Sequence, residues 1–217
     1  MQDLALSAYE ALRAGAQVLE ADKHGDKVLC LADGNFLKLF RRKRLISSAA
    51  LYPYAQRFAD NTETLQRLAV PCPRIIAVYR IAEIARDAVH YQPLPGDTLR
   101  QVIAAGEADT HLAAQLGELI AELHDQGVYF RSLHLGNVVK TPEGTLGLID
   151  LADMKKHRRA LSRQQRKRNF AHMLRYDSDR QWLLAGGHTS GLARAYLASS
   201  RVRWSQQELE AILSAAP

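Results

Sequence analysis

The sequence lacks the features of several protein classes. No uncharged apolar run approaches the ~18 residues that a membrane-spanning helix needs, and the first residues, MQDLALSAYEALRAG, lack the basic and apolar regions of a secretory signal. The two cysteines, Cys30 and Cys72, show no Cys-x-x-Cys or Cys/His spacing, so we expect buried reduced thiols rather than a zinc site. Repeats and low-complexity stretches are also missing. We therefore expect a globular, cytoplasmic protein whose 217 residues form one domain or two small lobes.

The charge of the chain is unevenly distributed. Lys and Arg number 29 against 23 Asp and Glu, a net charge of +6. Residues 38–44 hold five basic residues and residues 155–168 hold eight, with no acid in either block, so the rest of the chain has a net charge of −7. Such blocks are often solvated surface, but their density favours an anionic partner: phosphorylated lipid, nucleotide or nucleic acid.

Hydrophobic periodicity predicts a β-rich first half. Residues 3–14 have the pattern of a short amphipathic helix, and the apolar stripe from about residue 49 to 68 predicts a helix with one buried face. Short alternating runs separated by turn sequences predict strands, the first three forming an antiparallel meander. These strands are expected at 17–21, 27–32, 36–40, 74–80 and 87–92.

The second half has helical periodicity. It follows a rigid break at Pro93-Leu94-Pro95-Gly96. We expect helices at 98–104 and 110–126, the second ending at Gly127, then an irregular loop at 129–137 and a hairpin of 138–140 with 145–150. The remainder is expected to be helical, and its last helix starts with a Ser205/Glu208 capping box. We therefore predict an α+β fold in one domain. Its parts are an N-terminal lobe of antiparallel sheet with one main helix (1–92), a hinge (93–96) and a mostly helical C-terminal lobe (97–217).

Residues 130–150, FRSLHLGNVVKTPEGTLGLID, carry the chemistry. Phosphoryl transfer from ATP requires Mg²⁺ against the phosphates, and Mg²⁺ prefers hard oxygen ligands from one or two side chains. Asn137 in the loop and Asp150 after the hairpin offer such oxygens. Because a single hairpin separates them, the chain returns to the same place and both can share an ion. Taken alone, Asn137 could be a turn residue and Asp150 a strand-end cap.

Segment 130–137 resembles the catalytic loop of the protein-kinase-like superfamily, especially the His-x-Asp-Leu-His-x-x-Asn form of small-molecule and sugar kinases. Leu148-Ile149-Asp150 resembles the metal-binding strand of the same superfamily. The resemblance implies a two-lobed protein-kinase-like fold that uses ATP and Mg²⁺. Lys38, in FLKLF, stands where the superfamily keeps the lysine that contacts the α- and β-phosphates.

Two further stretches resemble a narrower group, the bacterial lipopolysaccharide core kinases, which phosphorylate Kdo or heptose. FLKLFRRKRLISSAALYPY followed by VPCPRI is similar to their N-terminal lobe, and RKRNFAHMLRY to a basic helix late in their C-terminal lobe. The resemblance covers roughly residues 15–200. It implies an anionic glycolipid or phosphorylated sugar as acceptor, at or beside the inner membrane surface. The basic residues we expect to bind it are Arg163, Arg166, Lys167 and Arg168.

The loop departs from the superfamily pattern at its catalytic acid. The residue five positions before Asn137 is Ser132, and Phe130 replaces the usual histidine. A serine hydroxyl cannot accept a proton at neutral pH as a carboxylate does, and a positioned base typically contributes about 10²–10⁴-fold in rate. The departure therefore bears directly on activity.

Two more departures lie in the N-terminal half. The glutamate that would pair with Lys38 is replaced at the inward helix position by Asn61, a neutral amide that would hold the lysine less firmly, while Glu63 projects elsewhere. The glycine-rich phosphate loop is reduced to Lys23-His24-Gly25-Asp26. Both changes weaken the expected contacts to ATP.

Three polar residues near the loop have plainer interpretations. His134 is expected to be structural, hydrogen-bonding the backbone of the loop. Asp153 is expected to be a surface turn acid, with a surrogate base as the less favoured role. Arg131 could be solvated or could anchor the loop, and the sequence does not separate these.

Three functions remain open on the sequence. The first is a kinase that transfers phosphate from ATP to a sugar of the lipopolysaccharide core or a similar glycolipid. The second is a pseudokinase that binds nucleotide as a scaffold or regulator in envelope biogenesis. Nucleic-acid binding through 155–168 is the third, and it is disfavoured because aromatic residues are not interleaved with the basic ones.

Overall fold

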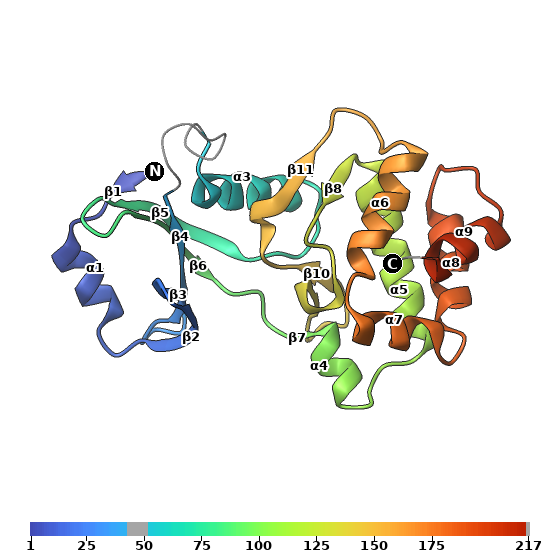
Figure 1. The fold of residues 1–217 in the computed structure, drawn as a ribbon, viewed down its shortest axis with the longest axis horizontal. Coiled ribbons are helices and arrows are strands. Elements are labelled where there is room, and N and C mark those ends of the chain that lie inside the picture. The colour runs from blue at the N-terminus through green and yellow to red at the C-terminus, as the bar shows by residue number, and fades with distance from the viewer. Residues whose placement is uncertain (43–51, 216–217) are drawn as a thin grey trace. The chain divides into compact units, whose positions relative to one another are not determined.

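The computed structural model describes residues 1–42 and 52–215 (Figure 1). Contacts divide the chain into an N-terminal unit, residues 1–94 with 151–153, and a C-terminal unit, residues 95–150 with 154–217. Residues 43–51, which include part of the first basic block and the expected start of the second helix, lie outside the described residues. None of the helices in the described ranges has the length and hydropathy that a bilayer crossing requires.

The N-terminal unit is built on a six-stranded sheet in the order β1-β5-β6-β4-β3-β2. Neighbouring strands are antiparallel, except that β1 and β5 are parallel. The predicted meander and the two later strands are confirmed. The strands are β1 (Gln2–Asp3), β2 (Gln17–Asp22), β3 (Gly25–Cys30), β4 (Phe36–Arg41), β5 (Arg74–Ile81) and β6 (Arg86–Gln92), and the helices are α1 (Leu6–Arg13), α3 (Tyr54–Arg67) and the short 3-10 helix η2 (Leu151–Asp153).

Strand β4 sends alternate side chains to the two faces of this sheet. Leu37 and Leu39 belong to the core that includes residues of α1. On the opposite face Phe40 stacks on Tyr54 of α3, with the ring centroids 6.3 Å apart. Lys38 alternates with Leu37 and Leu39, and its ammonium nitrogen lies 5.8 Å from the centroid of the Phe40 ring. Lys38 therefore lies on the α3 face.

The C-terminal unit is mostly helical. Two small sheets, β10-β9-β7 and β11-β8, lie among its helices. The capping box predicted at the last helix is confirmed, since the Ser205 hydroxyl accepts the Glu208 amide and the Glu208 carboxylate accepts the Ser205 amide. The elements are β7 (Asp97–Thr98), α4 (Leu99–Ala104), α5 (Thr110–Asp125), β8 (Val128–Phe130), η1 (Leu135–Asn137), β9 (Val138–Lys140), β10 (Leu146–Leu148), β11 (Met154–Lys156), α6 (Arg163–Met173), α7 (Asp177–Leu184), α8 (His188–Ser199) and α9 (Gln206–Ser214).

Two short strands correct the sequence prediction. The loop expected at 129–137 starts with β8, and the helical remainder expected after residue 150 is interrupted by β11. The two strands pair, with Met154 opposite Phe130. Both side chains are buried, and β11 satisfies backbone groups of β8 that would otherwise lack partners.

The two cysteines also differ from expectation. Both are free thiols, as predicted, but each is half-buried rather than buried. Burial raises the pKa of the Cys72 thiol to about 11, so this group stays protonated and unreactive at neutral pH.

Candidate functional site

The loop 130–137 is held at its start by a buried asparagine of α6. Asn169, which is 1% exposed, donates from Nδ2 to the Phe130 carbonyl at 2.7 Å and accepts the Phe130 amide at 3.4 Å through Oδ1. One side chain thus pairs with both backbone groups of Phe130, as a neighbouring strand would. The place where the loop leaves β8 is therefore fixed from inside the unit.

Behind Asn169 lies a chain of buried polar groups. His124 places Nε2 3.2 Å from the Asn169 Oδ1 and Nδ1 2.9 Å from the Tyr196 hydroxyl. Burial, with a further contribution from Arg166, lowers the pKa of His124 to about 3, so the ring is neutral. Because the asparagine oxygen can only accept, Nε2 carries the proton and Nδ1 accepts from Tyr196.

The middle of the loop is held by an aspartate of α7. Asp179 is 1% exposed and accepts the Leu135 amide at 3.1 Å. Its two oxygens also accept from Nε and Nη2 of Arg100 on α4, at 2.8 and 3.0 Å. This paired arrangement balances the buried charge and keeps the carboxylate directed at the loop backbone.

Asn137 and Asp150 lie at the same end of the β9–β10 hairpin, as the sequence predicted for this hairpin. The strands pair Val138 with Leu148, so Asn137 precedes and Asp150 follows that end. Asn137 accepts the Ile149 amide at its carbonyl, 3.0 Å, and its Nδ2 donates to the Ser132 carbonyl at 2.9 Å. The side-chain amide is thereby oriented by the loop.

Asp150 has an unusual backbone conformation. Its φ is +56°, in the left-handed region that residues other than glycine adopt rarely. Such conformations cost on the order of 1–3 kcal/mol and are concentrated at functional sites. The residue after it, Leu151, already belongs to the N-terminal unit. The strained dihedral is therefore found at the very residue that resembles the superfamily's metal ligand.

The chemistry of these side chains fits Mg²⁺. Asn137 and Asp150 supply an amide oxygen and a carboxylate, a set suited to a cation that keeps waters or phosphates as its other ligands. In the described residues no group of three or more His, Cys, Asp or Glu side chains could hold a metal. A site enclosed entirely by protein ligands of these types is thus not found in that part of the chain.

The N-terminal unit contains the other candidate contacts to ATP, Lys38 and Asn61. Asn61 donates from Nδ2 to the Leu151 carbonyl at 2.7 Å, a partner that the sequence did not predict. Helix α3 is thus tied to the residue that directly follows Asp150. Glu63 is exposed and lies 3.4 Å from Arg67, which agrees with the expectation that it projects elsewhere.

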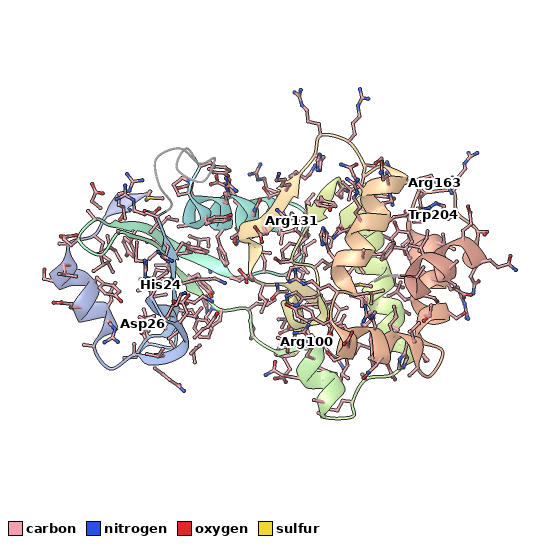
Figure 2. The ribbon with its side chains drawn as sticks, in the orientation of Figure 1. His24, Asp26, Arg100, Arg131, Arg163 and Trp204 are labelled. Atoms are coloured by element: carbon pink, nitrogen blue, oxygen red, sulfur yellow. The ribbon has the colours of Figure 1, made fainter. Side chains whose placement is uncertain are left out.

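The β2–β3 turn at 22–25, where the resemblance would place a phosphate loop, is short and bonded to its surroundings. Asp22 accepts the His24 amide at 2.7 Å, and Arg86 donates to the His24 carbonyl at 2.5 Å. Just after the turn, Asp26 (labelled in Figure 2) pairs with Arg13 of α1 at 2.7 Å. Since the turn has few backbone amides to offer, it does not form an extended phosphate cradle.

The second basic block divides into buried and exposed residues. Arg166 is 3% exposed and donates to Asp125, Tyr196 and Ser200. The prediction that it binds an anionic ligand is wrong for this residue, because the helical period turns it into the interior with Asn169. Its guanidinium is instead part of the buried polar group behind the loop.

The other lysines and arginines of the block are exposed. Arg163 pairs with Glu208 at 3.1 Å and lies over the Trp204 ring, 5.6 Å from its centroid (Figure 2). Lys167 and Arg168 are exposed on the outer side of α6. Of the four residues predicted to bind an anionic partner, Lys167 and Arg168 are thus exposed and outside the ion pairs found in the described residues.

Three polar residues near the loop were predicted to have structural or surface roles. Arg131 is exposed directly after β8 (Figure 2), and Asp153 is half-buried in η2. The prediction that His134 bonds the loop backbone is wrong at Nδ1, which is buried without a hydrogen-bond partner in the described part of the chain. Its ring instead packs edge-on against Tyr176, with centroids 5.1 Å apart.

A comparison with models of protein families shows the family of this chain. Residues 34–215 match the model of the lipopolysaccharide kinase (Kdo/WaaP) family. The chain belongs to this family. Its α+β architecture, with an N-terminal sheet and a mostly helical second unit, agrees with the expected fold class. A search among curated proteins finds no match.

Several solved structures of kinases are similar to this lipopolysaccharide kinase family member. WbdD in complex with a kinase inhibitor is 17% identical, with a TM-score of 0.48, covering 87% of this chain and 41% of that one. A structure of WbdD described as a bifunctional kinase-methyltransferase has a TM-score of 0.45 at 17% identity, covering 87% and 40%. The chain thus spans about two fifths of the length of these WbdD structures.

A third structure is a divergent kinase lacking the glycine-rich loop, described as regulating membrane ultrastructure of the Toxoplasma parasitophorous vacuole. It is 17% identical, with a TM-score of 0.44, covering 85% of this chain and 69% of that one.

Sequence reasoning missed the residues that support the loop. Asn169 lies one position before buried Phe170 and three after Arg166, so a polar residue on the apolar side of a helix was the available signal. Asp179 gave no comparable signal, since its partners Leu135 and Arg100 are far away in sequence.

Proposed function

We propose that this family member binds ATP with Mg²⁺ and transfers the γ-phosphoryl group to a sugar hydroxyl of the lipopolysaccharide core or a similar glycolipid. The observation that carries the proposal is the pair Asn137 and Asp150 at one end of a hairpin, with Asp150 held at a positive φ. The proposal includes the lobe boundaries expected above: lobes 1–92 and 97–217 joined by a hinge at 93–96.

Each residue has a role in this proposal. Asn137 and Asp150 hold Mg²⁺, which when bound neutralises charge on the phosphates. Lys38, on the α3 face of the sheet, contacts the α- and β-phosphates. Asn61 keeps its bond to the Leu151 carbonyl and thereby positions the segment that follows Asp150.

Ser132 occupies the place of the catalytic base. The acceptor hydroxyl oxygen forms the new P–O bond, the bond between the γ-phosphorus and the bridging oxygen of ADP breaks, and the hydroxyl proton leaves to water because Ser132 cannot take it. Since a loose transition state depends mainly on positioning and charge, loss of the base slows this transfer without abolishing it. The proposed enzyme is therefore slow.

A second candidate function rests on the same serine. A pseudokinase would bind nucleotide as a scaffold or regulator of envelope biogenesis and would not turn over. Both functions place the protein in the cytoplasm, with exposed Lys167 and Arg168 available for peripheral contact at the inner membrane.

The experiment that separates them measures nucleotide binding and transfer together. Thermal unfolding is recorded with ATP, with and without Mg²⁺, and radiolabelled ATP is offered with Kdo-containing lipopolysaccharide precursor. Mg²⁺-dependent stabilisation with labelled glycolipid supports the kinase, and stabilisation without any label supports the pseudokinase. A protein that binds no nucleotide under either condition contradicts both functions.

A further inference from the structure

A cluster of polar and aromatic side chains surrounds the second half of the loop, within the C-terminal unit. Arg100 of α4 (labelled in Figure 2) donates from Nε and Nη2 to Asp179, whose carboxylate is almost fully buried. Its third nitrogen, Nη1, has no hydrogen-bond partner in the described ranges. The Arg100 side chain is 36% exposed, so one edge of a firmly held guanidinium stays available to a ligand.

Gly136 leaves space beside that edge. A Cβ atom at this position would lie 3.1 Å from Nη1 of Arg100 and 3.2 Å from Nδ1 of His134. The φ of Gly136 is not positive, so space rather than backbone conformation is what glycine provides here. Arg100 Nη1 and His134 Nδ1, neither of which has a hydrogen-bond partner in the described residues, therefore lie on either side of Gly136. Gly136 itself lies between Ser132 and Asn137 in the loop.

Tyr176 lies beside the same two residues, in the connection from α6 to α7. The guanidinium carbon of Arg100 is 4.3 Å from its ring centroid, and that of Arg175 is 5.0 Å away. The tyrosine is 41% exposed. Two guanidinium groups are thus gathered at one accessible aromatic ring next to the loop.

The charge around this ring is not balanced by acids. Asp179 forms an ion pair with Arg100, and Asp177 forms one with Arg180. No carboxylate lies within ion-pair distance of Arg175 in the part of the chain that the structure describes. Arg175 therefore presents an uncompensated positive charge at the cluster.

The pKa of His134 is also affected by the positive charge of this cluster. Burial lowers its pKa to about 4, with further lowering by Arg100 and Arg175 that outranks the opposite effect of Asp179 and Asp150. The ring is neutral at physiological pH, so it can either donate or accept one hydrogen bond to a ligand.

We propose that Arg100, Arg175 and His134, gathered at Tyr176 beside Gly136, form a subsite for the anionic group of the acceptor sugar. The inference rests on the proposed function, because the acceptor hydroxyl must come to Ser132 in this same loop. Guanidinium groups bind either a carboxylate or a phosphate, and both occur on acidic sugars. Nucleotide phosphate is the competing source of such a group, and the test separates it.

The test uses the full chain and three probes: free Kdo, which carries a carboxylate, glucose 6-phosphate and neutral glucose. Binding is measured by ligand-observed NMR without nucleotide. Wild type is expected to bind one or both anionic sugars and not glucose. Arg175→Gln should weaken this binding roughly 10-fold or more, as loss of a charge-assisted hydrogen bond implies, and Arg175→Lys should restore part of it.

Two further variants guard the interpretation. Arg180→Gln, which removes a neighbouring arginine already paired with Asp177, should leave sugar binding unchanged. Gly136→Ala should weaken sugar binding because its methyl group crowds Nη1 and Nδ1. Arg100 is left intact because it also holds Asp179, and its loss could unfold the loop.

The outcomes separate this inference from the proposed function. Equal binding of glucose and the anionic sugars, or equal losses in Arg175→Gln and Arg180→Gln, overturns the subsite. Competition by ATP, together with weaker ATP binding in Arg175→Gln, assigns the cluster to nucleotide and also overturns it. If Arg175-sensitive sugar binding persists in a protein that binds no ATP, the subsite stands and the kinase proposal fails.

Discussion

The loop 130–137 and the β2–β3 turn are both expected to lie at the phosphates of ATP, but they are held in different ways. The loop is bonded to Asn169 and Asp179, which are almost completely buried. At the turn, half-buried Arg86 donates to the His24 carbonyl, and exposed Arg13 pairs with Asp26 just after the turn. Buried polar contacts are costly to leave unpaired, whereas exposed ion pairs contribute little.

The difference indicates which parts of the family's chemistry this chain retains. The loop departs from the superfamily pattern at two side chains, Phe130 and Ser132, while its backbone and Asn137 are held by hydrogen bonds. The turn at 22–25 is short and contains a single glycine, Gly25. In the proposed function, the C-terminal unit therefore holds metal and acceptor, and the N-terminal unit contributes mainly through Lys38.

The largest expected effect comes from restoring the acid in the well-held loop. Ser132→Asp should raise the rate of phosphate transfer by about 10²–10⁴-fold, because a positioned carboxylate can then accept the hydroxyl proton. Ser205→Asp is a matched control, since aspartate also suits that helix cap. An unchanged rate in Ser132→Asp, with nucleotide binding intact, would favour the pseudokinase.

Removing the support of the loop should cost stability. Asn169→Ala removes the buried partner of the Phe130 backbone groups and of His124 Nε2, and we expect the free energy of unfolding to fall by about 2–4 kcal/mol in urea denaturation. Asn35→Ala, at a half-buried asparagine whose side chain donates to exposed Asp33, should cost much less. Equal losses in the two variants would show that the loop is not held in this way.

The free energy of unfolding should fall at acidic pH, because two histidines of the C-terminal unit are neutral in the folded chain. The pKa of His124 is lowered to about 3 and that of His134 to about 4, so below about pH 6.5 the unfolded chain binds protons that the folded chain does not. Stability is complete above that pH and falls as pH decreases, by about 2 kcal/mol per histidine at pH 5, and less for half-buried His134.

Unfolding by urea at pH 7 and pH 5 measures this change. His124→Gln should lose about half of the pH dependence, while His111→Gln, at an exposed position of α5, should keep all of it. A wild-type protein equally stable at both pH values would contradict the buried, neutral state of these rings.

The smallest effect is expected at the turn. Arg13→Gln removes the pair with Asp26, in which the arginine is 49% exposed, and should cost less than about 1 kcal/mol. ATP affinity should stay within about twofold in this variant and in Lys23→Gln, because the turn does not cradle phosphate. A tenfold loss of ATP affinity in Lys23→Gln would instead give the turn a phosphate-binding role and remove the contrast with the loop.

The strands and the β9–β10 hairpin were predictable because alternation and turn residues are local signals. Strand β11 was not, since Lys155 and Lys156 interrupt any apolar pattern and only its pairing with β8 makes it a strand. Arg166 was misjudged because charge suggests exposure, whereas its partners come from elements distant in sequence. The bond from Asn61 to Leu151 was equally hidden, because it joins residues 90 positions apart.

Asn137 and Asp150 are the proposed metal site for nucleotide. Calorimetric titration of ATP into wild type and Asp150→Asn, each with and without Mg²⁺, tests it directly. We expect Mg²⁺ to strengthen ATP binding to wild type at least about tenfold and to have no effect on ATP binding to Asp150→Asn. If Mg²⁺ does not change the ATP affinity of wild type, or still raises that of Asp150→Asn, these residues are not the metal site.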